Sequence, residues 1–219
     1  MAKCVKRMGS FETNSSSMHS ICIMKNTPEK DLPWNDIYVE GDGTWDLSDT
    51  YGDKLYFGRY PFQILTTPGQ KAKYAIANMV EESGDEAYEE ILSALQTIEP
   101  NLKRISFVIR TGVEYDKATP ENIEKCKKWH NECSAYKDRI VYWDEDTGSV
   151  DDYLLEPFLK KYNISLSQFI LERNIIVVCD GDEYCQWTEA KNVGVIDTAN
   201  ILIEFPDRKK EGWRKEIEG

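Results

Sequence analysis

The sequence predicts an α+β fold, a single domain in which helices pack on a mixed or antiparallel sheet. Short β-branched runs interleave irregularly with helical patterns, without the strand–helix–strand repeat of a parallel sheet. The 219 residues are 41% hydrophobic, which is enough to bury a core. Because no repeat or linker-like segment divides the chain, we expect one domain over residues 1–205 and a charged tail over 206–219.

Strand and helix patterns follow one another through the first half of the chain. The apolar run at 20–25 predicts a largely buried strand. Helical spacing of apolar residues after Pro68 predicts a helix to Val80, and Ser83 with Glu86 is a capping-box pattern for a second helix. Weaker strand patterns lie at 3–8, 37–39 and 54–58, and residues 41–49 are rich in turn formers.

The second half predicts more strands than helices. Alternating or continuous β-branched runs predict strands at 103–110, 139–143, 174–179 and 200–205. Helical patterns lie at 119–136, 150–162 and 165–173. We expect Pro157 to kink or split the second of these helices, and Ser165 with Gln168 to cap the third. Gly181 predicts a hairpin that returns through residues 184–187.

Charge and targeting signals limit the class of protein. The net charge is −12, which disfavours direct binding along a nucleic-acid backbone and favours solubility or a basic protein partner. No apolar run has the length of a membrane span, and the N-terminus lacks the apolar core of a secretory signal. We therefore expect a cytoplasmic protein without membrane contact, in the host cytoplasm if a phage encodes it, whose six cysteines are thiols or metal ligands.

The most unusual part of the chain is the polar stretch Arg7–Ser20. Consecutive serine amides form an anion-binding nest in a suitable turn, and a capping Thr13 or Ser15 would open a helix whose N-terminus attracts phosphate. Arg7 would add a bidentate contact. The expected ligand-binding residues are Arg7, Thr13, Asn14, Ser15 and Ser17.

The same stretch contains groups for proton transfer. Glu12 and His19 are candidate acids or bases, and Ser16 becomes a nucleophile if His19 activates it. The competing interpretation is a serine-rich loop with no chemical role. Sequence spacing does not decide whether these side chains converge.

The string from Gly9 to Ser20, G-x-F-E-T-N-S-S-S-x-H-S, resembles an N-terminal signature of uncharacterised proteins of bacteriophages and Gram-positive bacteria. The resemblance covers about a dozen residues and nothing later in the chain. It implies a phage or mobile-element context and no particular reaction.

A second candidate site is the set Cys126, His130 and Cys133. On a helix these residues share one face and would supply three zinc ligands, with a fourth from another cysteine. The alternative, a buried apolar helix face, is the interpretation we favour, so the cofactor content stays open. The fourth-ligand candidates are Cys4, Cys22, Cys179 and Cys185.

Three functions fit these features. The first is a protein that binds a phosphorylated small molecule or nucleotide through residues 7–20, with or without turnover. The second is a non-enzymatic acidic protein that inhibits a host defence protein by binding to a basic surface of that host protein. The third is a virion-associated structural component whose hydroxyls are bonded internally.

Overall fold

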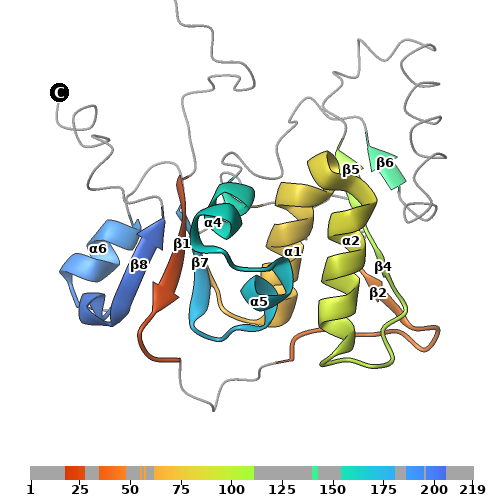
Figure 1. Cartoon of the computed structure of the whole chain (residues 1–219), viewed down its shortest axis with the longest axis horizontal. Helices are drawn as coiled ribbons and strands as arrows, with labels where there is room; N and C mark the ends of the chain where they lie inside the picture. The colour runs from red at the N-terminus through yellow and green to blue at the C-terminus, as the bar shows by residue number, and fades with distance from the viewer. Residues whose placement is uncertain are drawn as a thin grey trace, which may run out of the picture.

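The computed structural model describes residues 18–27, 35–47, 55, 57, 62–110, 140–142, 154–180, 186–194 and 196–205. Within them a four-stranded antiparallel sheet has the order β3-β7-β1-β8. Its strands are β1 (Met18–Met24), β3 (Gln63–Leu65), β7 (Ile175–Asp180) and β8 (Ile201–Phe205). The sheet with its helices confirms the α+β class (Figure 1).

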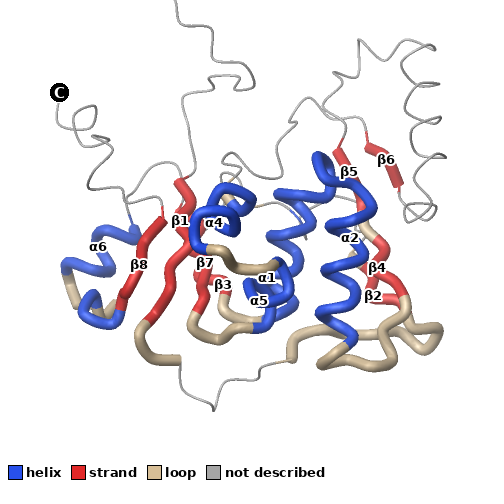
Figure 2. Tube along the Cα trace, in the orientation of Figure 1, coloured by secondary structure: helices blue, strands red, loops and turns tan. Residues whose placement is uncertain are grey.

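Helices and two short parallel strand pairs surround this sheet (Figure 2). The helical elements are α1 (Pro68–Ala75), the π-helix η2 (Ile76–Val80), α2 (Glu81–Gln96), α4 (Leu155–Tyr162), α5 (Leu166–Leu171), α6 (Gln186–Asn192) and the 3-10 turn η5 (Thr198–Asn200). The parallel pairs are β2 (Thr44–Asp46) with β4 (Arg104–Ser106), and β5 (Val108–Arg110) with β6 (Ile140–Tyr142).

Both faces of the sheet are covered, which explains the continuous apolar runs of its central strands. On one face, Ile21 and Val177 join the larger hydrophobic cluster with residues of α1, α2, α4 and α5. On the other face, Cys22 and Val178 join a smaller cluster that Trp187 of α6 completes. Figure 1 places α6 beside β8, at the opposite end of the molecule from α2.

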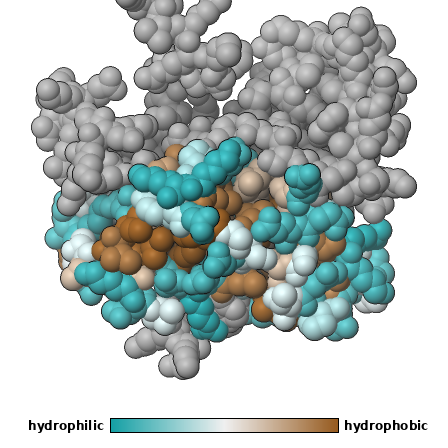
Figure 3. Space-filling model, in the orientation of Figure 1, coloured by the Kyte–Doolittle hydropathy of each residue, from teal (hydrophilic) through white to brown (hydrophobic). Residues whose placement is uncertain are grey.

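Helix α6 is fastened to β8 through one carboxylate. Trp187 Nε1 and Lys191 Nζ both donate to Glu204 Oε1, at 2.8 and 3.0 Å. The view in Figure 3 shows an apolar area over the region of β1 and β8, where Ile23 and Ile203 are half-buried cross-strand neighbours. The edge of the sheet at β8 is thus apolar on one face and closed by α6 on the other.

Three of the four strands of the main sheet were predicted well. The runs at 20–25, 174–179 and 200–205 correspond to β1, β7 and β8. The strand expected at 103–110 is present but interrupted at Phe107, and the one at 139–143 corresponds to β6. The capping box of Ser165 and Gln168 begins α5 as expected.

Several other predictions were wrong. Residues 37–39 are not a strand, and neither Leu55 nor Phe57 lies in one. Gln186 and Trp187 begin a helix instead of a returning strand, because the partners of β7 are β1 and β3.

Two helix predictions were also wrong. Pro157 neither kinks nor splits α4. This helix begins at Leu155, so the proline falls in the first turn, where its missing N–H has no intrahelical acceptor. Ser83 does not start a helix, since α1, η2 and α2 follow one another directly. The helix expected at 119–136, the strand at 3–8 and the tail at 206–219 lie outside the described residues.

Helix α1 begins with a double cap that ties it to the preceding loop. Thr67 Oγ1 accepts from Gln70 N, and Gln70 Oε1 accepts from Thr67 N. Asp36 strengthens the cap, because its carboxylate accepts from Thr67 Oγ1 at 2.6 Å and from Gly69 N at 2.8 Å. The start of α1 is therefore fixed by a carboxylate at its positive end.

Substituting Gly69→Ala should destabilise the protein by about 1–2 kcal/mol, although alanine is the better helix former. A Cβ at Gly69 would lie 2.4 Å from Asp36 Oδ1, so Asp36 would lose its two hydrogen bonds. Urea denaturation measures the effect. In the Asp36→Ala background the same substitution should be neutral or stabilising, and equal destabilisation in both backgrounds would contradict this explanation.

Candidate functional site

The polar stretch of the sequence joins the fold where β1 begins. Met18 is paired with Asp180, the last residue of β7. His19 is opposite Cys179, and Cys179 is opposite Gln63 of β3. Because antiparallel partners in register share a face, these last three side chains form one polar row across the sheet, on the side that α1 covers.

His19 is 1% exposed and has a partner for each ring nitrogen. Its Nε2 lies 2.6 Å from the carbonyl oxygen of Phe57, and its Nδ1 lies 3.4 Å from Tyr74 Oη. A carbonyl oxygen only accepts, so Nε2 carries the proton in this contact. In the neutral ring Nδ1 then accepts from the Tyr74 hydroxyl.

Tyr74 is itself held firmly. It is fully buried on α1, and its ring packs edge-on against Phe57 at 5.4 Å and tilted against Phe169 at 6.5 Å. The His19 and Tyr74 rings are 5.7 Å apart in an edge arrangement. The end of the polar stretch is thus fixed against α1 by aromatic packing as well as by hydrogen bonding.

A second polar side chain of α1 holds the opposite end of the sheet. Lys71 is fully buried, and its Nζ donates to the carbonyl oxygens of Glu172 at 2.6 Å and Ile175 at 3.2 Å, where β7 begins. Desolvation lowers the pKa of Lys71 to about 7, and the charge of Glu172 opposes this shift. Lys71 therefore links α1 to the turn between α5 and β7.

Asn78 is the third buried polar residue on this side of the helix, in η2. Its Nδ2 donates to the carbonyl oxygen of Tyr74 at 3.1 Å. The amide oxygen Oδ1 is buried and has no hydrogen-bond partner. The hydroxyl oxygen Oγ of Ser20 on β1 is also buried without a partner. Ser20 follows His19 on β1, and Asn78 follows Tyr74 by four residues, in η2.

Most residues of the predicted sites lie outside the described part of the chain. They are Arg7, Glu12, Thr13, Asn14, Ser15, Ser16 and Ser17 of the polar stretch, and Cys126, His130 and Cys133 of the predicted metal site. His19 is the predicted site residue that the structure places, and it is buried at the start of β1.

Two of the cysteines considered as a fourth zinc ligand are described, and both are buried thiols. Cys22 belongs to the smaller cluster and Cys179 to the larger, so they lie on opposite faces of the sheet and cannot share one metal ion. Among the described residues no group of three or more His, Cys, Asp or Glu side chains is arranged to hold a metal.

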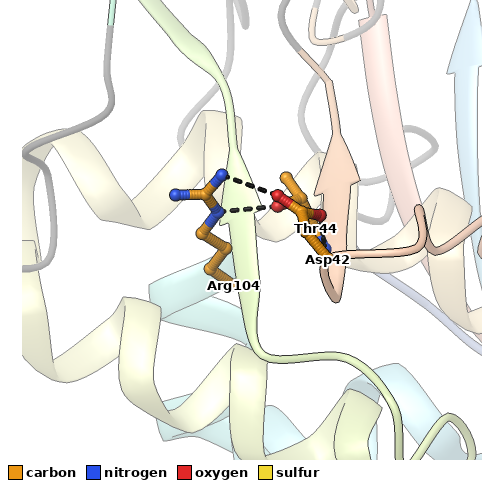
Figure 4. Close-up of polar contacts among 3 residues, drawn as sticks. All are labelled: Asp42, Thr44 and Arg104. Carbon is orange, nitrogen blue, oxygen red and sulfur yellow. Dashed lines mark hydrogen bonds and ion pairs between the residues drawn. The ribbon is translucent and has the colours of Figure 1, made fainter.

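A partly exposed polar cluster lies away from this end of the sheet, at the parallel pair of β2 and β4, and consists of Asp42, Thr44 and Arg104 (Figure 4). Arg104 donates from Nε to Thr44 Oγ1 at 2.6 Å and pairs with Asp42 Oδ2 at 3.1 Å. Hydrogen bonds from Thr44, with smaller contributions from Arg104, lower the pKa of the Asp42 carboxyl. These contacts hold the short strands β2 and β4 together, and this structural role explains the presence of all three polar residues.

The sequence did not single out Lys71, Tyr74 or Asn78. Their spacing of three and four residues places them on one side of a helix, beside the small apolar residues Ala72 and Ala75. The signal that could have identified these three residues is the occurrence of polar residues within an apolar helical stripe.

Comparisons with protein-family models, curated proteins and solved structures found no match to this chain. In the part of the chain that the structure describes, no helix combines the length and apolar character required to cross a bilayer.

Replacing Tyr74 by Phe should destabilise the protein by about 1–2 kcal/mol, because Nδ1 of His19 loses its buried donor. Nitrogen-detected NMR of the His19 ring checks the cause directly. We expect the Nε2–H tautomer in the wild type, and a wild-type ring protonated on Nδ1 alone would contradict the assignment.

Lys71 should make stability depend on pH in the alkaline range. Its pKa falls from 10.5 to about 7 on folding, so between these values the unfolded chain binds more protons and stability rises with pH. The contribution is at most about 1.4 kcal/mol per pH unit. Urea titrations at pH 7, 8 and 9 should show this rise in the wild type relative to Lys71→Met; parallel curves would refute it.

Proposed function

We propose that this protein binds a phosphorylated small molecule or a nucleotide through residues 7–20, at the end of the sheet where β1 begins. The observation that carries the proposal is the burial of His19 and Ser20, the last two residues of the polar stretch, inside the central sheet. A serine-rich linker without a role would not need a hydrogen-bonded histidine in the core to fix its end.

The chemistry of the stretch supports an anionic ligand. Its serines and Thr13 offer hydroxyl and amide donors, and Arg7 offers a planar guanidinium that matches phosphate. The buried end of the stretch reduces the conformational entropy that ligand binding would otherwise cost. The resemblance of Gly9–Ser20 to a phage signature makes an accessory protein of a phage or mobile element the natural setting.

Within this proposal we assign His19 a positioning role. Its two ring nitrogens contact the Phe57 carbonyl oxygen and the Tyr74 hydroxyl, which fix the orientation of the ring in the core. Glu12 remains the candidate acid or base of the stretch if the ligand is turned over. The proposal therefore requires binding and leaves turnover to be measured.

The alternative of an acidic inhibitor has less support. It predicts carboxylates concentrated on one face. Among the described residues, exposed carboxylates lie on α2 and also near α6, which Figure 1 shows at opposite ends of the molecule. They include Glu86, Glu89, Glu90, Glu189 and Asp197.

The alternative of a virion component predicts serine hydroxyls bonded to the protein's own backbone. Ser20 is the described hydroxyl of the stretch, and its buried Oγ has no hydrogen-bond partner. This observation does not favour a purely structural role for the stretch.

Isothermal titration calorimetry with inorganic phosphate, AMP, ADP, ATP and GTP tests the proposal. We expect at least one of them to bind, with affinity reduced about tenfold or more in Arg7→Ala and Ser16→Ala, since each removes a donor to the anion. Thr44→Ala, in the polar cluster at β2 and β4, is the matched control and should bind like the wild type. Failure of all five compounds to bind would reject the proposal.

A further inference from the structure

Strand β8 lies at one edge of the main sheet. Within the described residues β1 pairs with it on one side, and no strand lies on the other. The outer side of an edge strand has backbone N–H and C=O groups that the sheet itself does not use. These groups can form hydrogen bonds with an added strand, which is a common way of binding extended peptides.

The hydrogen bonds of β1 show which residues of β8 point toward their neighbour. Met24 N donates to the carbonyl oxygen of Asn174, which directly precedes β7. Because the direction of the backbone groups alternates along an antiparallel strand, Ile23 points to the other side, toward its register partner Ile203. The same alternation turns Phe205, two residues further along β8, toward β1.

The residues between these positions point outward. The C=O and N–H of one peptide group lie in a plane and point in opposite directions. The carbonyl oxygen of Leu202 therefore points away from β1, since the N–H of Ile203 points toward it. Glu204 lies between Ile203 and Phe205, so both of its backbone groups point outward. The edge thus offers acceptors at Leu202 and Glu204 and a donor at Glu204.

The side chains along this edge do not shield it. Edge strands are commonly protected from further pairing by exposed charged side chains. The one charged residue of β8 is Glu204, and its carboxylate accepts from Trp187 and Lys191 of α6. Leu202 is 60% exposed, and Figure 3 shows an apolar area over the region of β1 and β8. The edge is therefore suited to a strand with apolar side chains.

Lysine side chains lie at both ends of β8. Lys25 Nζ donates to the carbonyl oxygen of Ala199, just before the strand, and Lys161 Nζ lies 5.0 Å from the centre of the Phe205 ring, at its end. The nearby carboxylate of Asp197 caps η5. Antiparallel pairing of β8 with a second copy would bring Lys25 of each copy toward Lys161 of the other, and the net charge of −12 adds repulsion. Carboxylates at the ends of a foreign strand would complement both lysines.

We propose that β8 is a docking edge for an extended segment of another protein, apolar in its centre and acidic at both ends, which adds to the sheet as a fifth strand. Backbone hydrogen bonds to Leu202 and Glu204 hold the segment, and Lys25 and Lys161 select its charge. This edge is formed by described residues alone and does not depend on anion binding by residues 7–20.

NMR of the isotope-labelled protein with the end-blocked peptide Glu-Thr-Val-Thr-Val-Thr-Glu tests the inference. In the free protein the Glu204 amide should exchange with solvent about tenfold faster, or more, than the amides of Ile203 and Phe205. Saturating peptide should slow the exchange of Glu204 by about tenfold or more, because this amide then donates to the peptide. A peptide with lysine in place of both glutamates should bind about fivefold more weakly or worse.

N-methylated peptides provide a matched control. Residues paired across two strands share a face, so a threonine of the peptide lies opposite Glu204 when the glutamates and valines share the face of Ile203 and Phe205. Methylation of the central threonine nitrogen removes an N–H that points to β8 and should weaken binding about tenfold or more. Methylation of a valine nitrogen, which points to solvent, should leave the affinity unchanged.

Several results would overturn the inference. If Glu204 exchanges as slowly as Ile203 in the free protein, its edge is already occupied, and sedimentation equilibrium distinguishes a second copy from a segment of the same chain. Absence of binding by the acidic peptide would also reject the inference, as would equal affinity of the acidic and lysine peptides. Equal affinity of the two N-methylated peptides would show that no strand is added at β8.

Discussion

The docking of helix α1 onto the sheet is the constraint on which this structure depends. One helix reaches both ends of the central strands with polar groups that water cannot contact. At one end Tyr74 meets His19 of β1, and at the other Lys71 holds the carbonyl oxygens at the start of β7. Apolar packing alone would tolerate sliding of the helix along the sheet, whereas these directional contacts fix its position.

This constraint connects the fold to the proposed binding site. β1 is a central strand, and its first residues are the last residues of the polar stretch. Fixing His19 therefore fixes the point from which the stretch departs. The same helix continues into the π-helix η2, where Asn78 donates a hydrogen bond to the carbonyl oxygen of Tyr74.

Sequence patterns predicted the parts of the fold that depend on local chemistry. The buried strands β1 and β7 are continuous apolar runs, and Ser165 with Gln168 forms its cap through neighbouring residues. The three-residue strands β2 and β3 were missed, because their pairing with distant segments decides their conformation. Trp187 was placed in a returning strand because Gly181 predicted a hairpin, whereas it lies on α6 and donates a hydrogen bond to Glu204 of β8.

The candidate site was predictable in part. The abundance of hydroxyl and amide groups directed attention to residues 7–20, and His19 lies at their boundary with the core. Lys71, Tyr74 and Asn78 were not predicted, since a polar residue on a helix normally faces water. Their inward orientation follows from the position of α1 on the sheet, which the sequence pattern alone does not specify.

The most direct test of this account is chemical-shift mapping of the isotope-labelled protein during titration with AMP. The signals of His19 and Ser20 should move together and saturate at one dissociation constant, while those of Thr44 and Arg104 stay in place. Saturable binding that shifts signals elsewhere and leaves those of His19 and Ser20 unmoved would contradict the claim that the ligand binds where β1 begins.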